Sequence, residues 1–319
     1  MFVSTRFVAS AAVAALVASA AGLEVNGFDA APERYSRFAI DDDGQYVPTA
    51  SSSFMLGSDD LSGIGWAGDV SRNRNKVGRA VTLVSRRHVL FPAHWAITPG
   101  DRVQFMNADG AVFSYQVTDT AGTYRDTGNP SDLSIATLDE RVDQSIREFP
   151  IGRREGIDYV DLELIVYGKY GRVGTNRLPT YWYDAFDVGT WRYSTTTAGP
   201  VGTAMSESGD SGSPTFVRIN GELVVVGIRW LQTVDTWAPA FLEQLQDVAA
   251  SDGESIRVGG SQPRCVADLT NDGMLRIDDV VAFLSSFGAQ DDVADFAATF
   301  GVWSLEDVLA FLAAFEDGC

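Results

Sequence analysis

Residues 207–214, E-S-G-D-S-G-S-P, contain the residue types that nucleophilic catalysis requires. Ser211 lies at the centre, and a serine hydroxyl needs a neighbouring base and a site for the developing oxyanion. Gly209 and Gly212 lack a Cβ, so the backbone around Ser211 can follow a tight path and direct N–H groups at a substrate. The pattern predicts a nucleophile loop, although a Gly/Ser/Asp surface loop between strands has the same composition.

The chain contains only two histidines, the residue that most often acts as a general base. His88 lies in an apolar stretch that we expect to be a strand. His94 follows that strand in P-A-H-W, where a rigid scaffold could present it, so we choose His94 as the base. Asp132 is the best candidate to orient the imidazole, because it opens the alternating strand S-D-L-S-I-A-T-L. The rival aspartates lie in turn-like or charged contexts: Asp119, Asp126 and Asp139.

The motifs A-H-W, D-L-S-I-A and G-D-S-G-S-P carry His94, Asp132 and Ser211 in this order. They resemble the chymotrypsin/trypsin class of serine proteases over about residues 60–250. The resemblance implies a mainly β fold of two antiparallel six-stranded barrels, split near residues 145–160, with the active site between them. It also implies a serine endopeptidase that acts on protein or peptide substrates and needs no cofactor for catalysis.

The same resemblance implies a role for each residue of the motifs. Ser211 would attack the scissile carbonyl, His94 would accept and return the proton, and Asp132 would orient His94. The backbone N–H groups of Gly209 and Ser211 would form the oxyanion hole. Asp210 holds the position that, in this family, often pairs with a new α-amino group made by zymogen cleavage. An arginine partner, or no zymogen step at all, are the alternatives.

The expected specificity pocket is apolar. By the resemblance, Met205 lies at its base and Trp230 and Leu231 form its other wall, which favours small or medium uncharged side chains such as Ala, Val or Leu. Two departures from the family pattern are Arg229 in G-I-R-W and Pro92 before the A-H pair. They keep open an alternative function, a catalytically inactive protease-like binding or adhesion protein of the cell surface or extracellular matrix. An α/β-hydrolase esterase would need G-x-S-x-G and the order Ser, Asp, His, and the sequence has neither.

Length and charge bound the kind of protein. The 319 residues predict about two domains, and the net charge of −19 disfavours nucleic acid and anionic membranes as partners. Residues 1–20 have the basic start, short apolar core and A-S-A cleavage site of a secretory signal peptide. We therefore expect a protein that is secreted or associated with the cell surface, without a membrane span once the signal peptide is removed, and the family resemblance implies a bacterial source.

The region before and around the protease motifs divides into segments. Residues 21–60 are either a pro-segment or an N-terminal strand that packs on the first barrel, and S-G-I-G at 62–65 is the nearest match to the family's I-V-G-G start. Residues 61–250 form the protease domain, and 251–263 form a Gly/Pro-containing linker. Within the domain, the patterns predict strands at 81–84, 88–91 and 162–168, hairpins at 103–117 and 215–228, and a helix near 241–248.

Residues 264–319 form a separate module with an internal repeat, in which each copy has a loop and a short amphipathic helix. The first loop has oxygen ligands at EF-hand-like spacing for one Ca²⁺: Asp268, Thr270, Asp272 and Asp279. The second loop has lost the pattern, since Ala297 and Thr299 fill ligand positions. A solvated acidic turn is the alternative for the first loop.

The two cysteines of the chain, Cys265 and Cys319, bracket this module. In a secreted chain, such a pair predicts a disulfide that joins the ends of a small domain. The paired helices and the final Gly-Cys resemble the GC-type dockerin-like C-terminal domain of secreted bacterial proteins. That resemblance implies a small all-α, EF-hand-like module with a cohesin-like or cell-surface partner.

Overall fold

The computed structural model describes residues 23–40, 46–49, 52–57, 59–67, 79–95, 97–125, 128–154, 159, 162–177, 190–192, 199–231, 234–259, 267, 269–270, 275–297 and 302–317. The predicted signal peptide, both cysteines, Asp268 and Asp272 lie outside these residues. Strands predominate in the described part, which confirms the mainly β prediction.

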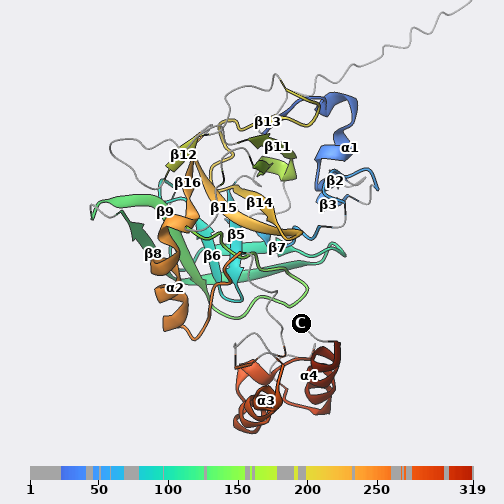
Figure 1. The fold of residues 1–319 in the computed structure, drawn as a ribbon, viewed down its shortest axis with the longest axis vertical. Helices are drawn as coiled ribbons and strands as arrows, with labels where there is room; N and C mark the ends of the chain where they lie inside the picture. Colours follow the sequence, from blue (N-terminus) through green and yellow to red (C-terminus); the bar gives the residue numbers. More distant parts are fainter. Residues whose placement is uncertain are drawn as a thin grey trace, which may run out of the picture.

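The first half of the β region is a closed antiparallel barrel with the strand order β4-β5-β6-β9-β8-β7 (Figure 1). Its strands are β4 (Ile64–Ala67), β5 (Ala80–Ser85), β6 (His88–Phe91), β7 (Arg102–Met106), β8 (Val112–Tyr124) and β9 (Pro130–Leu138). The predicted strands at 81–84 and 88–91 and the predicted hairpin at 103–117 are confirmed. Apolar side chains from every strand fill the barrel, among them Val81, Val103 and Leu138.

The second half is a six-stranded sheet, with the order β11-β10-β14-β15-β16-β12, rather than a second closed barrel. Its strands are β10 (Glu163–Tyr167), β11 (Val173–Arg177), β12 (Thr190–Arg192), β14 (Pro214–Ile219), β15 (Glu222–Leu231) and β16 (Val234–Trp237). The strand next in space to β11 is β13 (Ala204–Met205), but it has only two residues and pairs with β1 (Glu24–Val25). A single bridge, Thr175 to Thr203, joins that pair to β11, which is too little backbone pairing to close the sheet.

The hairpin predicted at 215–228 is confirmed as β14 and β15. Asn220 and Gly221 both have positive φ, 51° and 85°, at the turn. Positive φ at both central residues is what a two-residue type I′ hairpin requires, and asparagine and glycine tolerate it best. This hairpin follows directly after the nucleophile loop and therefore anchors its C-terminal end.

A buried core joins the barrel to the sheet. Leu133 and Ile135 of β9 pack in one cluster with Ile165 of β10 and Phe216 of β14, while Ala136 of the same β9 strand faces the barrel interior. Strand β9 thus alternates as predicted, with both of its faces buried. Because interiors are close-packed, this cluster fixes the barrel and the sheet relative to each other.

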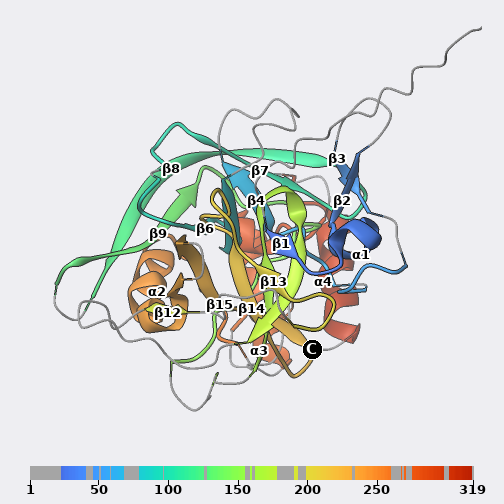
Figure 2. The same cartoon turned by 90° about the horizontal axis from the view of Figure 1, so that it is seen from above.

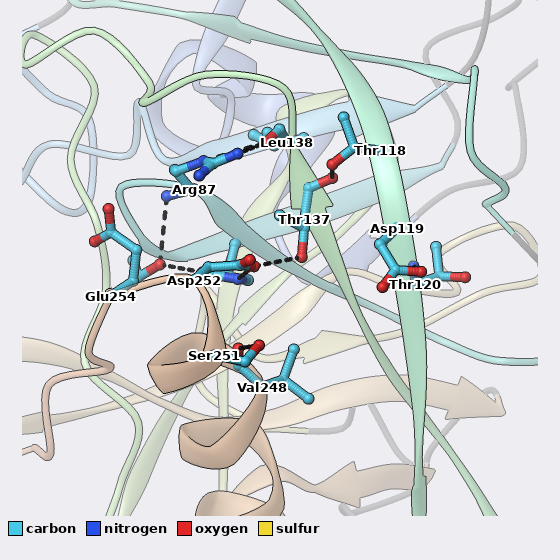
Figure 3. Close-up of polar contacts among 12 residues, drawn as sticks. Arg87, Thr118, Asp119, Thr120, Thr137, Leu138, Val248, Ser251, Asp252 and Glu254 are labelled. Atoms are coloured by element: carbon cyan, nitrogen blue, oxygen red, sulfur yellow. Dashed lines mark hydrogen bonds and ion pairs between the residues drawn. The ribbon is translucent and has the colours of Figure 1, made fainter. Parts of the chain in front are cut away.

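Helix α2 (Leu242–Ser251) follows the sheet through the 3₁₀ turn η3 (Ala238–Phe241) and confirms the helix predicted near 241–248. Asp252, just past its end, accepts a hydrogen bond from Thr137 of β9 at 3.0 Å (Figure 3). The same carboxylate lies 2.9 Å from His88 Nε2, and His88 Nδ1 lies 2.7 Å from Ser85 Oγ. His88 is fully buried, so it is a structural residue that ties α2 to the barrel.

The N-terminal segment packs on both halves. Strand β1 lies on the sheet side through β13, and η1 (Phe28–Ala30) and α1 (Pro32–Tyr35) follow it. Strands β2 (Phe38–Ile40) and β3 (Tyr46–Pro48) form a hairpin whose Phe38 packs on Trp66 of the barrel. The described part of residues 21–60 thus packs on the first barrel at the β2–β3 hairpin and on the sheet at β1, and the pro-segment alternative stays a prediction.

The C-terminal module has its own core between α3 (Ile277–Ala289) and α4 (Leu305–Asp317). These helices lie below the β region in Figure 1 and behind it in Figure 2. Phe283 and Phe311 occupy equivalent places in the two repeats, and their rings stack with centroids 4.1 Å apart. The short η4 (Asp292–Ala294) connects the copies. Among the described residues, no helix is long and apolar enough to cross a membrane.

Candidate active site

His94 and Asp132 form a close pair. His94 Nδ1 lies 2.8 Å from Asp132 Oδ2, and the backbone N–H of His94 donates to Asp132 Oδ1 at 2.7 Å. The Asp132 side chain is 9% exposed and the His94 side chain 37%. Because an ionised carboxylate only accepts hydrogen bonds, Nδ1 of the neutral imidazole carries the proton and Nε2 is the basic nitrogen. The imidazole is thus held in the tautomer that a general base needs.

Strand pairing creates this contact. Strand β6 ends at Phe91, which pairs with Ser134 of β9, and the chain then turns through Pro92. Two residues toward the start of β9, Asp132 therefore lies opposite the loop that carries His94. The N–H of Ala93 donates to the Asp132 carbonyl at 3.3 Å and continues the pairing.

Ser211 lies in a tight loop between β13 and β14, where it is half-buried. Gly209 and Gly212 have φ of 100° and 85°, which side-chain-bearing residues rarely adopt. The Gly212 N–H donates to the carbonyl of Arg229, and the Arg229 N–H donates to the carbonyl of Ser213, each at 3.0 Å. Strand β15 therefore holds the loop in place.

The nucleophile loop contacts residues that come before and after His94 in the chain. A Cβ built on Gly212 would lie 2.4 Å from Trp95 Cζ2 and 3.0 Å from Pro92 Cδ, so this glycine is in contact with the residues that flank His94. Ser211 and His94 consequently lie in adjoining loops. In the described contacts, Ser211 Oγ forms no hydrogen bond with His94; such catalytic hydrogen bonds are often long in a free enzyme and tighten when substrate binds.

Trp95 contacts both loops of the candidate site, which the sequence did not indicate. Its ring packs on Phe91, with centroids 6.2 Å apart, and the guanidinium of Arg79 lies 5.4 Å from its centroid. Together with its approach to Gly212, these contacts make Trp95 the spacer between the histidine loop and the nucleophile loop.

Asp210 points away from Ser211 into the protein. It is fully buried and accepts hydrogen bonds at 2.7 Å from the N–H groups of Lys169 and Glu207, with a further one from the backbone of Leu23. Burial raises the pKa of its carboxyl group, and these N–H donors oppose the rise. The N-terminal segment therefore reaches the nucleophile loop at Leu23, whereas S-G-I-G at 62–65 leads into barrel strand β4.

Arg229, which the sequence marked only as a departure, is buried behind the same loop. Its Nε donates to Asp235 Oδ1 at 2.6 Å and its Nη2 to Thr215 Oγ1 at 3.2 Å. Burial lowers the pKa of Arg229 to about 10, against the opposing charge of Asp210. The ion pair occupies the space between β15 and β16, and a Cβ on Gly227 would come within 2.3 Å of Asp235 Oδ2.

The three predicted pocket residues lie on two strands. Met205 is half-buried at the end of β13, where it pairs with Glu24. Trp230 is half-buried and Leu231 is 56% exposed, both at the end of β15. Leu231 is exposed apolar surface two residues beyond Arg229, whose backbone pairs with the nucleophile loop.

Of the proposed calcium ligands, Thr270 and Asp279 are described. The N–H and Oγ1 of Thr270 donate to Asp279 Oδ1 at 2.9 and 2.8 Å, and the Arg276 N–H donates to Oδ2 at 2.8 Å. Asp307 of the second repeat binds the Phe296, Ala297 and Ser304 N–H groups in the same way. The closing aspartate therefore ties each loop to its helix, and its oxygens are of the hard type that Ca²⁺ prefers. Within the described ranges, no cluster of three or more metal-binding side chains occurs.

No model of a known protein family matches the chain, and no curated protein matches it.

Proposed function

We propose that the chain is a secreted serine endopeptidase of the chymotrypsin-like class. The observation that carries the proposal is the His94–Asp132 pair. The loop that carries His94 contacts Gly212, the residue after Ser211. In this proposal, the six-stranded sheet with the β1–β13 pair corresponds to the second barrel of that class, and the catalytic groups lie at its junction with the closed barrel.

The proposed reaction is acyl transfer. Ser211 Oγ attacks the scissile carbonyl while His94 Nε2 takes its proton, and His94 then returns that proton to the leaving amine. Asp132 stabilises the imidazolium that forms between these steps. Water then attacks the acyl-enzyme by the reverse sequence of proton transfers, which releases the second product and frees Ser211.

Backbone donors stabilise the charge that develops on the carbonyl oxygen. The N–H groups of Gly209 and Ser211 form the proposed oxyanion hole, and the left-handed backbone at Gly209 turns the chain at this point. Loss of one such donor removes about 3 kcal/mol of transition-state stabilisation. Buried Asp210 holds the turn from inside through its bonds to Lys169 and Glu207.

The substrate side chain before the cut is small or medium-sized and uncharged. Met205, Trp230 and Leu231 offer it apolar contacts, and none of them could neutralise a lysine or arginine side chain stripped of water. A peptide-library digest read by mass spectrometry would identify the cleaved bonds. Dominant cleavage after arginine or lysine would overturn this pocket but leave the catalytic residues standing.

The C-terminal module is proposed to bind one Ca²⁺ through Asp268, Thr270, Asp272 and Asp279, with a disulfide between Cys265 and Cys319. When bound, the cation would neutralise the crowded carboxylates of the loop. The module would attach the enzyme to a cohesin-like or cell-surface partner outside the cell. An inactive protease-like adhesion protein is the second candidate, and the two departures from the family pattern, Pro92 and Arg229, favour it.

Hydrolysis of a protein substrate by matched variants separates the two candidates. We expect Ser211→Ala and His94→Ala to abolish hydrolysis, and Asp132→Asn to lower kcat by about 10⁴, because an amide would favour the wrong imidazole tautomer. Ser208→Ala, in the same loop, is the control and should retain activity. Circular dichroism would show that each variant is folded. Full activity in folded Ser211→Ala would contradict the proposal.

A further inference from the structure

A small cavity lies beside the nucleophile loop, at the junction of the barrel and the sheet. Its volume is about 20 Å³, which is room for about one water molecule or one carboxylate oxygen. Its walls come from β4, the start of β5, and the 3₁₀ turn η2 (Lys169–Gly171) after β10. The lining side chains that the argument uses are Trp66, Arg79, Lys169 and Tyr170. This cavity is separate from the apolar residues proposed to hold the side chain before the cut.

Several lining residues contact the loop around Ser211. A Cβ on Gly209 would lie 3.6 Å from Lys169 Nζ, and a Cβ on Gly212 would lie 2.5 Å from the Ala80 carbonyl oxygen. Arg79 stacks on Trp95, the residue after His94. A substrate group bound in the cavity would therefore belong to the first or second substrate residue from a scissile bond placed at Ser211.

Two cationic residues, Lys169 and Arg79, are among the residues that line this cavity, in a strongly acidic protein. The chain has 43 acidic residues against 24 basic ones and only two lysines, Lys76 and Lys169. In the described structure, neither Lys169 nor Arg79 forms an ion pair; each packs on an aromatic ring, Lys169 Nζ at 4.7 Å from the Tyr170 centroid. Some other described cations are ion-paired, as Arg141 is with Glu254 and Arg257 with Glu222.

The backbone around Lys169 is held in a fixed conformation. Tyr170 has φ of 65°, a left-handed conformation that costs a non-glycine residue free energy and persists where the surroundings hold it. The N–H of Lys169 is fixed at 2.7 Å by the buried carboxylate of Asp210, the neighbour of Ser211. The lysine is thus anchored to the nucleophile loop itself.

We infer that this cavity is a subsite for a carboxylate of the substrate, carried by the first or second residue after the scissile bond. The inference rests on the proposed peptidase function and adds a substrate class to it. An ammonium and a guanidinium that form no ion pair with the described residues can both donate to one carboxylate, and the aromatic walls exclude part of the water. In the proposed function, the substrate residue before the scissile bond binds at the apolar residues of β13 and β15. The residues after the scissile bond would therefore bind at the cavity beside β5.

The test uses the full chain and quenched peptides that differ only in alanine, aspartate or lysine after the cleaved bond. We expect the aspartate peptide to have a kcat/KM about three- to tenfold above that of the alanine peptide at low salt, and this ratio should fall toward one near 0.5 M NaCl. A second arm compares peptides with a free or an amidated C-terminus two residues after the cut. Preference in the first arm indicates a side-chain carboxylate, and preference in the second indicates a terminal one.

Variants of Lys169 assign the effect to this cavity. Lys169→Met should lower the aspartate-to-alanine ratio toward one, Lys169→Glu should favour the lysine peptide, and Lys169→Arg should keep the preference for aspartate. Arg102→Met, which removes an exposed cation on β7, should leave the ratio unchanged. Equal kcat/KM for aspartate and alanine peptides in both arms, with the alanine peptide cleaved, would overturn the subsite alone. Cleavage of no peptide, with no covalent labelling of Ser211, would overturn the peptidase function and the subsite together.

Discussion

Single residues set the geometry of the candidate site. Asp132 was predictable, because an aspartate at the start of an apolar strand can be buried and paired, and its bonds to His94 fix both the backbone and the ring. The contacts of Trp95 and Lys169 were not predictable. Trp95 meets Gly212, which lies 212 − 95 = 117 residues further along the chain, and Lys169 meets Asp210, 41 residues further along. Nothing in the local sequence states which of these segments meet.

Gly212 is expected to tolerate no side chain, and Gly221 provides a matched comparison. Both have φ of 85°, but a Cβ would clash with Trp95 at Gly212 and would meet nothing within 4 Å at Gly221. Gly221→Ala should lower the free energy of unfolding by about 1–2 kcal/mol from backbone strain alone and leave peptidase activity near that of the parent. Gly212→Ala should additionally displace Ser211 from His94 and lower kcat by about 100-fold or more. Equal activities of the two folded variants, measured with one peptide, would contradict the account.

At the scale of elements, the sequence predicted the turn of the β14–β15 hairpin, but it could not predict whether the second sheet closes into a barrel. Asn220-Gly221 predicted a hairpin because a two-residue type I′ turn requires positive φ at both central positions, and asparagine and glycine adopt positive φ most readily. Closure of the second barrel depends instead on how β13 is shared between β1 and β11, which are distant in sequence. Arg229 looked like a disruption in sequence, because its partner Asp235 becomes its neighbour only when β15 pairs with β16.

The ion pair between Arg229 and Asp235 should be costly to break from one side. Its side chains are 1% and 0% exposed, so Arg229→Met leaves a buried carboxylate without its cation and should lower the free energy of unfolding by about 3–5 kcal/mol. Combining Arg229→Met with Asp235→Leu should restore most of that loss. Arg218→Met, which breaks the exposed pair with Asp59, should cost about 1 kcal/mol or less. Urea unfolding measures all three, and a double variant no more stable than Arg229→Met would refute the interpretation.

His88 gives the protein a stability that depends on pH. Burial lowers its pKa below the ordinary value near 6.5; Asp252 and Glu254 oppose this shift, and Arg87 adds to it. Below pH 6.5 the unfolded chain therefore takes up a proton that folded His88 does not, so stability falls as the pH drops from 6.5 toward the lowered pKa. The free energy of unfolding of the parent should fall more steeply over this window than that of His88→Gln, by at most about 1.4 kcal/mol per pH unit. Parallel curves for the two proteins would show that His88 is not the cause.

At the scale of the whole molecule, the sequence predicted the division into a β region and a helical module. The repeat in residues 264–319 was visible because its aromatic positions recur, and Phe283 stacks on Phe311 as equivalent members of the two copies. The bounds of the β region were predicted from the motifs around His94, Asp132 and Ser211, and not from a repeating pattern of apolar residues. The core that joins barrel and sheet could not be predicted, because its members come from eight strands and α2.

Calcium binding should be confined to the first loop of the module. Isothermal titration of the full chain with Ca²⁺ should give one site, because the second loop replaces ligand positions with Ala297 and Thr299. Asp272→Ala should remove the binding, whereas Thr299→Ala in the second loop should leave it unchanged. Absence of binding, or equal binding by Asp272→Ala, would favour a solvated acidic turn.

The central claim is that Ser211 is a nucleophile activated by His94. A serine-reactive fluorophosphonate probe, applied to the purified protein without residues 1–20, tests it most directly. Mass spectrometry should locate the label on Ser211 and not on Ser208, and His94→Ala should label far more slowly, because the hydroxyl then lacks its base. No label on Ser211, under conditions that label a control serine protease to completion, would contradict the claim.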